Sequence, residues 1–449
     1  MRLINNPRES QIVKIWQHRL LDRTELITES GEPIRIIYPG RINDDRGADF
    51  RDAVIAIKGK LAIGDIEVHI KSSDWQAHQH HHDPVYNRVV LHVVMWHDTG
   101  AATKLNNGEN IPILVLDKYT KSPISQPSNG VDPLATLTMP CLNAVDRLPT
   151  DIMAQLLDTA GEERFLAKAS RFQADLAQTE ASQCFYQGIM GALGYAKNKF
   201  PCLELAQRLP LHLLEATTQG NLSDEECLAR QQALLLGTAG LLPSQRPNWH
   251  QEHNQWIDKL ERLWASFCLS KAMSHNAWQL FKVRPNNFPV RRIVAMSYLI
   301  LRYKEKGIFN AVVDMVKEVL LSKGHRRLEK GLQVTTNGYW ADHFDFGLGG
   351  RIRSPSLLGS RRAADIVVNV LLPFTFAWGK VTSQPELEKK ALELYRSYPK
   401  LEVNTVERHM MDQLRLDTSL VNSARRQQGL IHIYNSLCIQ GRCNCCPLS

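Results

Sequence analysis

The sequence predicts an α+β protein, with a mixed sheet in the N-terminal part and a mainly α-helical part after it. Short β-branched segments separated by Gly, Asn and Asp clusters occupy residues 33–116, which is typical of strands and turns. From residue 144 onward the apolar residues recur with the 3.6-residue period of amphipathic helices. At 449 residues the chain is long enough for two or three domains.

The predicted sheet domain covers residues 1–120. An amphipathic helix, SQIVKIWQHRLL, precedes the strand segments PIRIIYP, AVIAIKG, LAIGDIEVHIK, RVVLHVVMW and IPILVL, and a hairpin is expected across KGK. Residues 121–143 concentrate Ser, Pro, Asn and Gly and are predicted to be a linker. A helical, basic domain over 144–437 and a Cys-rich tail over 438–449 complete the predicted organisation.

The composition is that of a globular protein, with 43% hydrophobic residues. The start, MRLINNPRES, lacks the apolar core of a signal peptide, and the longest apolar stretches are shorter than a membrane span. We therefore expect a cytoplasmic protein with no membrane partner.

Positive charge is concentrated in the predicted helical part. Residues 1–143 contain 16 Lys and Arg against 17 Asp and Glu, while the rest of the chain contains 38 against 29. Lys and Arg neutralise phosphate groups, so this distribution suits a nucleic acid as the partner. The glycine-rich segment FDFGLGGRIRSPSLLGSRRAADI supplies four candidate phosphate contacts: Arg351, Arg353, Arg361 and Arg362.

One predicted strand carries ionisable residues along a single face. In GDIEVHIK, Glu67, His69 and Lys71 occupy alternate positions, while the apolar residues between them point the other way. Asp49 lies in GADF, on the approach to the hairpin partner. A phosphodiesterase that uses Mg²⁺ or Mn²⁺ needs such oxygen ligands and a group beside the attacking water. We predict Asp49 and Glu67 as Mg or Mn ligands, with Lys71 or His69 beside the water.

This pattern resembles the restriction-endonuclease-like, or PD-(D/E)XK, nuclease core, in which an Asp, a second acid and a Lys bind the metal and activate water. The resemblance implies a restriction-endonuclease-like sheet domain with nuclease activity. The spacing departs from the motif, because His69 stands two residues after the acid and Lys71 stands four residues after it. Either His69 substitutes for the lysine, or Lys71 reaches inward, or the site is not a nuclease.

Histidines are concentrated just downstream of this strand. Six of the sixteen lie between His78 and His97. Imidazole binds Zn, Fe and Mn, so a His/carboxylate metallohydrolase of another class, using His78 and His92, is an alternative. Asp74 is a further candidate ligand or supporting residue. We expect the His80 to His82 run to form a solvated loop.

The end of the chain carries the pattern C-x4-C-x-C-C-P. We predict Cys438, Cys443 and Cys446 as metal ligands, because adjacent Cys445 and Cys446 cannot easily both bind one ion. Cys141, at the predicted domain boundary, is the first candidate for the fourth ligand. The metal is either Zn or a 4Fe–4S cluster. Three C-terminal cysteines with one distant cysteine are similar to the arrangement in iron–sulfur nucleases of the RecB and Cas4 type.

Four segments resemble the signature segments of an uncharacterised bacterial family, a domain of unknown function. They are PGRINDDRGADFRDAVI, GDIEVHIKSSDWQAHQHHHDPVYNRVVLHVV, WQLFKVRPNNFPVRRI and RRQQGLIHIYNSLCIQGRCNCCP. The resemblance spans nearly the whole chain and implies no activity. The residues themselves favour a metal-dependent nuclease or nucleic-acid-processing protein, with a non-catalytic nucleic-acid-binding or scaffold protein as a third possibility.

Overall fold

A computed structural model describes most of the chain. It covers residues 7–18, 26–119, 141–142, 144–246, 254–267, 272–349 and 355–449. The chain divides into two compact units. The sheet unit contains residues 1–160, 403–421 and 429–449, and the helical unit contains residues 161–402 and 422–428. Two of the four divisions fall inside helices, one in α4 (Thr150–Leu176) and one in α17 (Ala424–Ser436).

The predicted α+β class is confirmed. Within the described residues, the sheet unit holds a seven-stranded mixed sheet in the order β1, β2, β4, β5, β6, β9, with β3 paired to β4. The strands are Leu26–Ile27 (β1), Pro33–Tyr38 (β2), Arg41–Ile42 (β3), Phe50–Ile57 (β4), Lys60–Lys71 (β5), Val89–Trp96 (β6) and Ile113–Val115 (β9). The hairpin expected across KGK is present as antiparallel β4 and β5, whereas β5, β6 and β9 run parallel.

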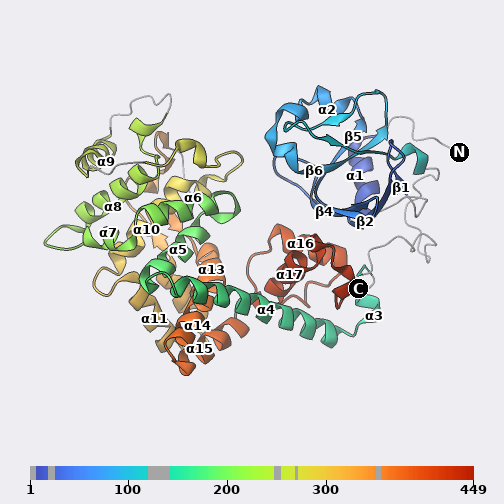
Figure 1. Ribbon diagram of the computed structural model, residues 1–449. Helices are drawn as coiled ribbons and strands as arrows, with labels where there is room; N and C mark the ends of the chain where they lie inside the picture. Colours follow the sequence, from blue (N-terminus) through green and yellow to red (C-terminus); the bar gives the residue numbers. More distant parts are fainter. Residues whose placement is uncertain are drawn as a thin grey trace. The chain divides into compact units, whose positions relative to one another are not determined.

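Helix α1 (Glu9–His18) packs against one face of this sheet (Figure 1). Its Ile12 and Trp16 are buried in the same cluster as Ile66 and Val68 of β5. Because side chains alternate along a strand, the residues between these two apolar positions project from the opposite face. The amphipathic helix and the alternating strand therefore fix which face of β5 carries its polar residues.

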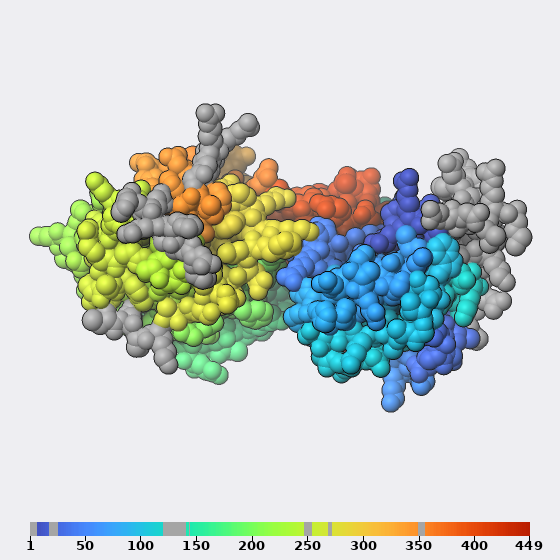
Figure 2. Space-filling model, turned by 90° about the horizontal axis from the view of Figure 1, so that it is seen from above, coloured from blue at the N-terminus to red at the C-terminus, as the bar shows by residue number. Residues whose placement is uncertain are grey.

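The connection from β5 to β6 lies over that opposite face. It consists of α2 (Asp74–Ala77) and two 3₁₀ turns, His80–His82 and Pro84–Arg88. Trp75 is buried in a small cluster with Ala48 and Val89, which anchors this connection. The short pair β7 (Thr103–Lys104) and β8 (Asn110–Ile111) follows β6. Figure 2 shows the blue-to-cyan residues of this region gathered in one continuous body.

The sheet unit also includes part of the predicted helical domain, so the predicted division at residues 121–143 differs from the structure. Helices α3 (Ala144–Arg147) and α16 (Thr405–Leu414), with the end of α17 and the tail, share a buried cluster with Tyr38 and Val54 of the sheet. The helical period of the sequence cannot predict this packing, because it identifies the apolar face of a helix but not the part of the protein that the face contacts. Apart from Cys141 and Leu142, the predicted linker lies outside the described residues.

The helical unit contains most of the remaining helices. They are Ala181–Leu193 (α5), Tyr195–Arg208 (α6), Leu211–Ala216 (α7), Asp224–Thr238 (α8), Gln255–Ser266 (α9), Pro289–Arg302 (α10), Ile308–Glu318 (α11), Gly324–Leu332 (α12), Ser360–Ile366 (α13), Leu372–Val381 (α14) and Pro385–Arg396 (α15). Two short antiparallel pairs accompany them: Val334–Thr335 (β10) with Ser356–Leu358 (β13), and His343–Asp345 (β11) with Leu348–Gly349 (β12).

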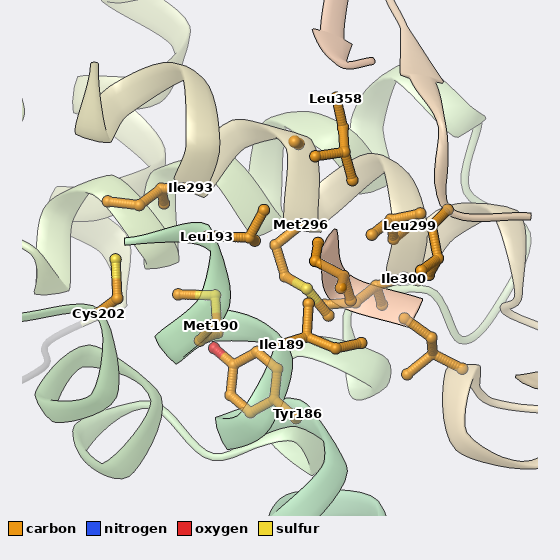
Figure 3. Packing of buried hydrophobic residues seen from close by; sticks show 14 of the residues in the cluster. Tyr186, Ile189, Met190, Leu193, Cys202, Ile293, Met296, Leu299, Ile300 and Leu358 are labelled. Atoms are coloured by element: carbon orange, nitrogen blue, oxygen red, sulfur yellow. The ribbon is translucent and has the colours of Figure 1, made fainter. Parts of the chain in front are cut away.

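The core of the helical unit forms where α5 meets α10. Figure 3 shows Ile189, Met190 and Leu193 of α5 together with Met296 and Leu299 of α10, and all belong to one buried cluster. The continuous helical stretch Ser360–Val381 is long and apolar enough to cross a membrane by composition, but 61% of its apolar window is buried inside the protein. A buried core helix satisfies the same criteria of length and composition.

Candidate metal centre

The polar face of β5 is buried in its middle and exposed at its end. Glu67 and His69 are only 6% and 1% exposed. Lys71 is exposed at the last position of the strand, and its backbone N–H donates to Asp74 Oδ2 at 2.9 Å. Asp74 therefore serves the turn into α2. Of the two groups predicted beside the attacking water, His69 lies in the interior and Lys71 lies at the surface.

The two predicted carboxylates lie next to each other. The Asp49 N–H donates to Glu67 Oε2 at 3.1 Å, and Asp49 Oδ2 accepts the Val68 N–H at 3.0 Å. Burial raises the pKa of Glu67 to about 8. Burial and the adjacent Glu67 carboxylate raise the pKa of Asp49 to about 7. Glu9, at the start of α1, adds a further negative charge that acts on both carboxyls. A cation between these groups would stabilise their ionised forms.

Three imidazoles converge beside these carboxylates. One ring nitrogen from each of His69, His78 and His80 lies within 4.8 Å of the other two. His69 Nε2 is 3.2 Å from His78 Nδ1, and Glu67 Oε1 is 3.1 Å from His80 Nε2 and 3.5 Å from His69 Nε2. Bonds of 2.0–2.1 Å to a tetrahedral cation place its ligands roughly 3.3 Å apart. These separations fit three imidazole ligands of one divalent cation, with Glu67 Oε1 beside two of them.

One nitrogen of this group lacks the hydrogen bond that its burial requires. His80 Nε2 is within ion-pair distance of Glu67 Oε1, yet it is buried without hydrogen-bond geometry to any described residue. Burial lowers the pKa of His69 to about 2 and also lowers the pKa of His80. The low pKa values of His69 and His80 favour their neutral rings, which is the form that binds metals. A bound cation would satisfy this nitrogen and offset the buried carboxylates.

A hydrogen-bonded chain behind His69 fixes the orientation of its ring. His69 Nδ1 is 2.9 Å from His92 Nε2, and His92 Nδ1 is 2.9 Å from Thr103 Oγ1. If the lone pair of His69 Nε2 faces the cation, its Nδ1–H donates to His92, and the His92 Nδ1–H donates to Thr103. Such chains hold a ligating imidazole in one tautomer. His92 thus lies behind His69, which agrees with the supporting role, one of the two roles that the sequence suggested for it, the other being that of a ligand.

The expectation that His80 lies in a solvated loop is wrong. His80 is 9% exposed, and its ring packs on Tyr86 at 3.9 Å between centroids and near Trp75 at 5.3 Å. Gln79 has φ +60°, a left-handed conformation that turns the chain between His78 and His80. One signal of this arrangement is present in the sequence: His78 and His80 flank Gln79, a polar residue that tolerates a turn. His82 is exposed, as expected.

The arginines proposed as phosphate contacts do not form one group. Arg351 and Arg353 lie outside the described residues. Arg361 is exposed and pairs with Glu402 at 2.8 Å. The Arg362 guanidinium lies over the Tyr195 ring, and its side chain is 11% exposed. Interior packing on an aromatic ring therefore removes Arg362 from the set of surface phosphate contacts.

Comparison with known proteins gives a family and no function. Neither the curated proteins nor the solved structures gave a match to this chain. The resemblance to an uncharacterised domain family is confirmed by a match over residues 9–404. The chain belongs to the DUF2851 family, described as protein of unknown function.

Proposed function

We propose that the sheet unit is a metal-dependent hydrolase that cleaves phosphodiester bonds of a nucleic acid. The observation that carries the proposal is the convergence of the His69, His78 and His80 nitrogens beside the buried Glu67 carboxylate. An acid before β4 and an acid followed by His69 on its antiparallel partner also support the comparison with the PD-(D/E)XK core. His69 then takes the place of the motif's lysine.

The ligand set favours Mn²⁺ or Zn²⁺ over Mg²⁺. Mg²⁺ prefers oxygen ligands and is reluctant to lose its water, whereas imidazole suits Zn and Mn-type ions. The proposed ligands are Glu67 Oε1 with one nitrogen from each of the three histidines. His78 is exposed, so the centre opens to solvent on its side. A bound cation would act as a Lewis acid toward water and the scissile phosphate.

Asp49, which the sequence predicted as a metal ligand, is not in the group of converging donor atoms, and we assign it the role of accepting the proton of the attacking water. Its carboxyl adjoins Glu67, and burial raises its pKa to about 7. A general base is most effective when its pKa is near the working pH. His69 is unsuited to this role because burial lowers its pKa to about 2. Lys71, at the exposed end of β5, is available for a phosphate of the substrate.

A nuclease assay on the full-length protein tests the proposal. Single- and double-stranded DNA and RNA are incubated with Mg²⁺, Mn²⁺ or Zn²⁺. We expect cleavage that is strongest with Mn²⁺ or Zn²⁺ and that Glu67→Gln and His78→Ala abolish. His82→Ala is the matched control, because this exposed histidine comes from the same loop without belonging to the centre. The nuclease proposal would be refuted if no combination of these ions and substrates gave cleavage that Glu67→Gln abolishes.

A His/carboxylate metallohydrolase of another class is the second candidate. The specific observation in its favour is that three imidazole nitrogens lie within 4.8 Å of one another beside the Glu67 carboxylate, whereas Lys71 is at the surface. A panel of uncharged ester and amide substrates separates the two candidates. Hydrolysis of these substrates, sensitive to His78→Ala and combined with inactivity on nucleic acids, would select the second.

A further inference from the structure

Four cysteines from distant parts of the sequence lie together in the sheet unit. Cys141 and Cys438 are 8% and 7% exposed and belong to one buried cluster, and Cys446 packs against it. Burial raises the pKa of Cys141 and Cys438, and the thiols of Cys443 and Cys446 raise both further. Three of the cysteines thus share one cluster, and Cys443 is close enough to act electrostatically on Cys141 and Cys438. None of them is in a disulfide.

The folding of the tail brings these thiols together. Cys438–Gln440 and Cys443–Cys445 are two 3₁₀ turns, and Gly441 between them has φ +65°. A Cβ at Gly441 would lie 2.8 Å from Val54 of β4, so the turn approaches the sheet more closely than a side chain permits. The Arg147 guanidinium donates to the Leu448 carbonyl at 3.0 Å, and Figure 1 shows the C-terminus beside α3. The tail is thus an ordered element packed on the sheet.

The spacing of the thiols favours a cluster over a single ion. A tetrahedral zinc with Zn–S bonds of about 2.3 Å holds its sulfurs about 3.8 Å apart. Among the described residues, the donor atoms found three together within 4.8 Å belong to the imidazole group and include none of these thiols. A 4Fe–4S cluster binds each thiolate at a different iron, so its sulfurs are farther apart. One of the thiols also accepts a hydrogen bond from a side chain, because Gln413 Nε2 donates to Cys141 Sγ at 3.3 Å.

We propose that Cys141, Cys438, Cys443 and Cys446 bind a 4Fe–4S cluster that fastens the C-terminal tail to the sheet. On binding, each of the four thiols would lose its proton to solvent and form one S–Fe bond to the cluster. Gln413 supplies a hydrogen bond of the kind that tunes such clusters. Cys445 is exposed and takes no part. The site is separate from the imidazole centre and does not depend on the proposed hydrolase activity.

The test is made on the full-length protein purified without oxygen. We expect a brown protein that absorbs near 400 nm, with about four irons and four acid-labile sulfides per chain. Cys438→Ser and Cys446→Ser should lower the iron and sulfide content severalfold. Cys445→Ser, in the same tail, and Cys227→Ser, buried in the helical unit, should retain the full content. His78→Ala should also retain the cluster, which separates this test from that of the hydrolase.

The wild-type protein decides the proposal even if a serine variant fails to fold. One zinc per chain without sulfide would overturn the cluster, and so would the absence of both metals. Retention of full iron and sulfide in Cys438→Ser or Cys446→Ser would overturn the assignment of the ligands. Iron and sulfide loss in Cys445→Ser equal to that in Cys446→Ser would do the same.

Discussion

The two units bury polar side chains in opposite ways. In the helical unit, buried cations reach fixed acceptors. Arg291 is fully buried, and its guanidinium donates to the carbonyls of Trp340, His343 and Ser356. Arg246 forms a bidentate pair with a buried aspartate, with N–O distances of 2.7 and 2.9 Å. In the sheet unit, by contrast, neutral imidazoles and carboxyls that resist ionisation face one another.

We interpret this difference as one between a structural role and the metal-binding role proposed above. A buried charge whose hydrogen bonds all end on carbonyls joins loops together and needs no ligand. Buried carboxylate oxygens and imidazole nitrogens whose lone pairs point at one another are unfavourable unless a cation binds between them. Lys168 also has fixed acceptors in the helical unit, since its Nζ donates to Asn369 Oδ1 and Gln428 Oε1, and burial lowers its pKa well below the ordinary value. Glu67 and His80 belong to the second kind of buried group.

The largest effect is expected at Arg291. Arg291→Met leaves three buried carbonyls without their donor, and each unsatisfied group costs about 1–3 kcal/mol. We expect the free energy of unfolding to fall by about 3–5 kcal/mol, measured by urea denaturation. Arg361→Met is the control, because its exposed pair with Glu402 contributes less than about 1 kcal/mol. Equal losses of unfolding free energy in the two variants would show that the buried hydrogen bonds of Arg291 stabilise the helical unit no more than an exposed ion pair does.

The second prediction concerns Glu67. Glu67→Gln should weaken Mn²⁺ or Zn²⁺ binding more than about 100-fold, because it removes a charged ligand rather than a supporting residue. Without metal, the same variant should unfold at the same or higher urea concentration, since burial opposes ionisation of this carboxyl. Titration calorimetry and urea unfolding in a chelator measure the two effects. A metal-free protein strongly destabilised by this change would mean that Glu67 is structural.

The third prediction tests the chain behind His69. His92→Phe removes the acceptor of His69 Nδ1 and should weaken metal binding by about 10–100-fold. Thr103→Val, one step farther from the cation, should have a smaller effect in the same direction. Metal titration of both variants measures the difference. If His92→Phe abolished binding as completely as Glu67→Gln does, His92 would be a ligand itself.

The smallest effect is a pH dependence from an imidazole outside the centre. His409 Nε2 lies 2.5 Å from the Tyr38 hydroxyl, and burial lowers the pKa of His409 to about 4. Its folded pKa is below the unfolded value near 6.5, so protonation favours unfolding. The contribution of His409 to stability should be nearly constant above about pH 7.5 and should fall by about 1 kcal/mol from pH 6.5 to 5.5. His409→Gln should reduce this slope in urea unfolding followed against pH.

Local pattern was sufficient for much of the sheet unit. The alternation in GDIEVHIK placed Glu67 and His69 on one face, and the KGK turn defined the β4 and β5 hairpin. These features depend on neighbours within a few residues, where the two-residue period of a strand decides which way a side chain points. The tail cysteines were also selected from the sequence, because adjacent thiols cannot easily both bind one ion, and Cys141 was selected because it lies at the predicted domain boundary.

Other features required contacts between distant segments. The three consecutive histidines have the same chemistry, and only packing against Trp75 and Tyr86 separates His80 from its neighbours. Glu9 acts on the centre because α1 crosses the sheet, which no local pattern shows. Arg362 lost its expected role because Tyr195 lies beneath its guanidinium.

The sequence by itself determined the class of fold, the polar face of β5 and the residue types available for metal binding. Only the tertiary structure decided which histidines converge, that α16 and the tail belong with the sheet, and that Lys71 lies at the surface. The physical reason is the range of the interactions. Backbone periodicity is set within one element, whereas burial and the approach of donor atoms depend on elements that meet only after the chain has folded.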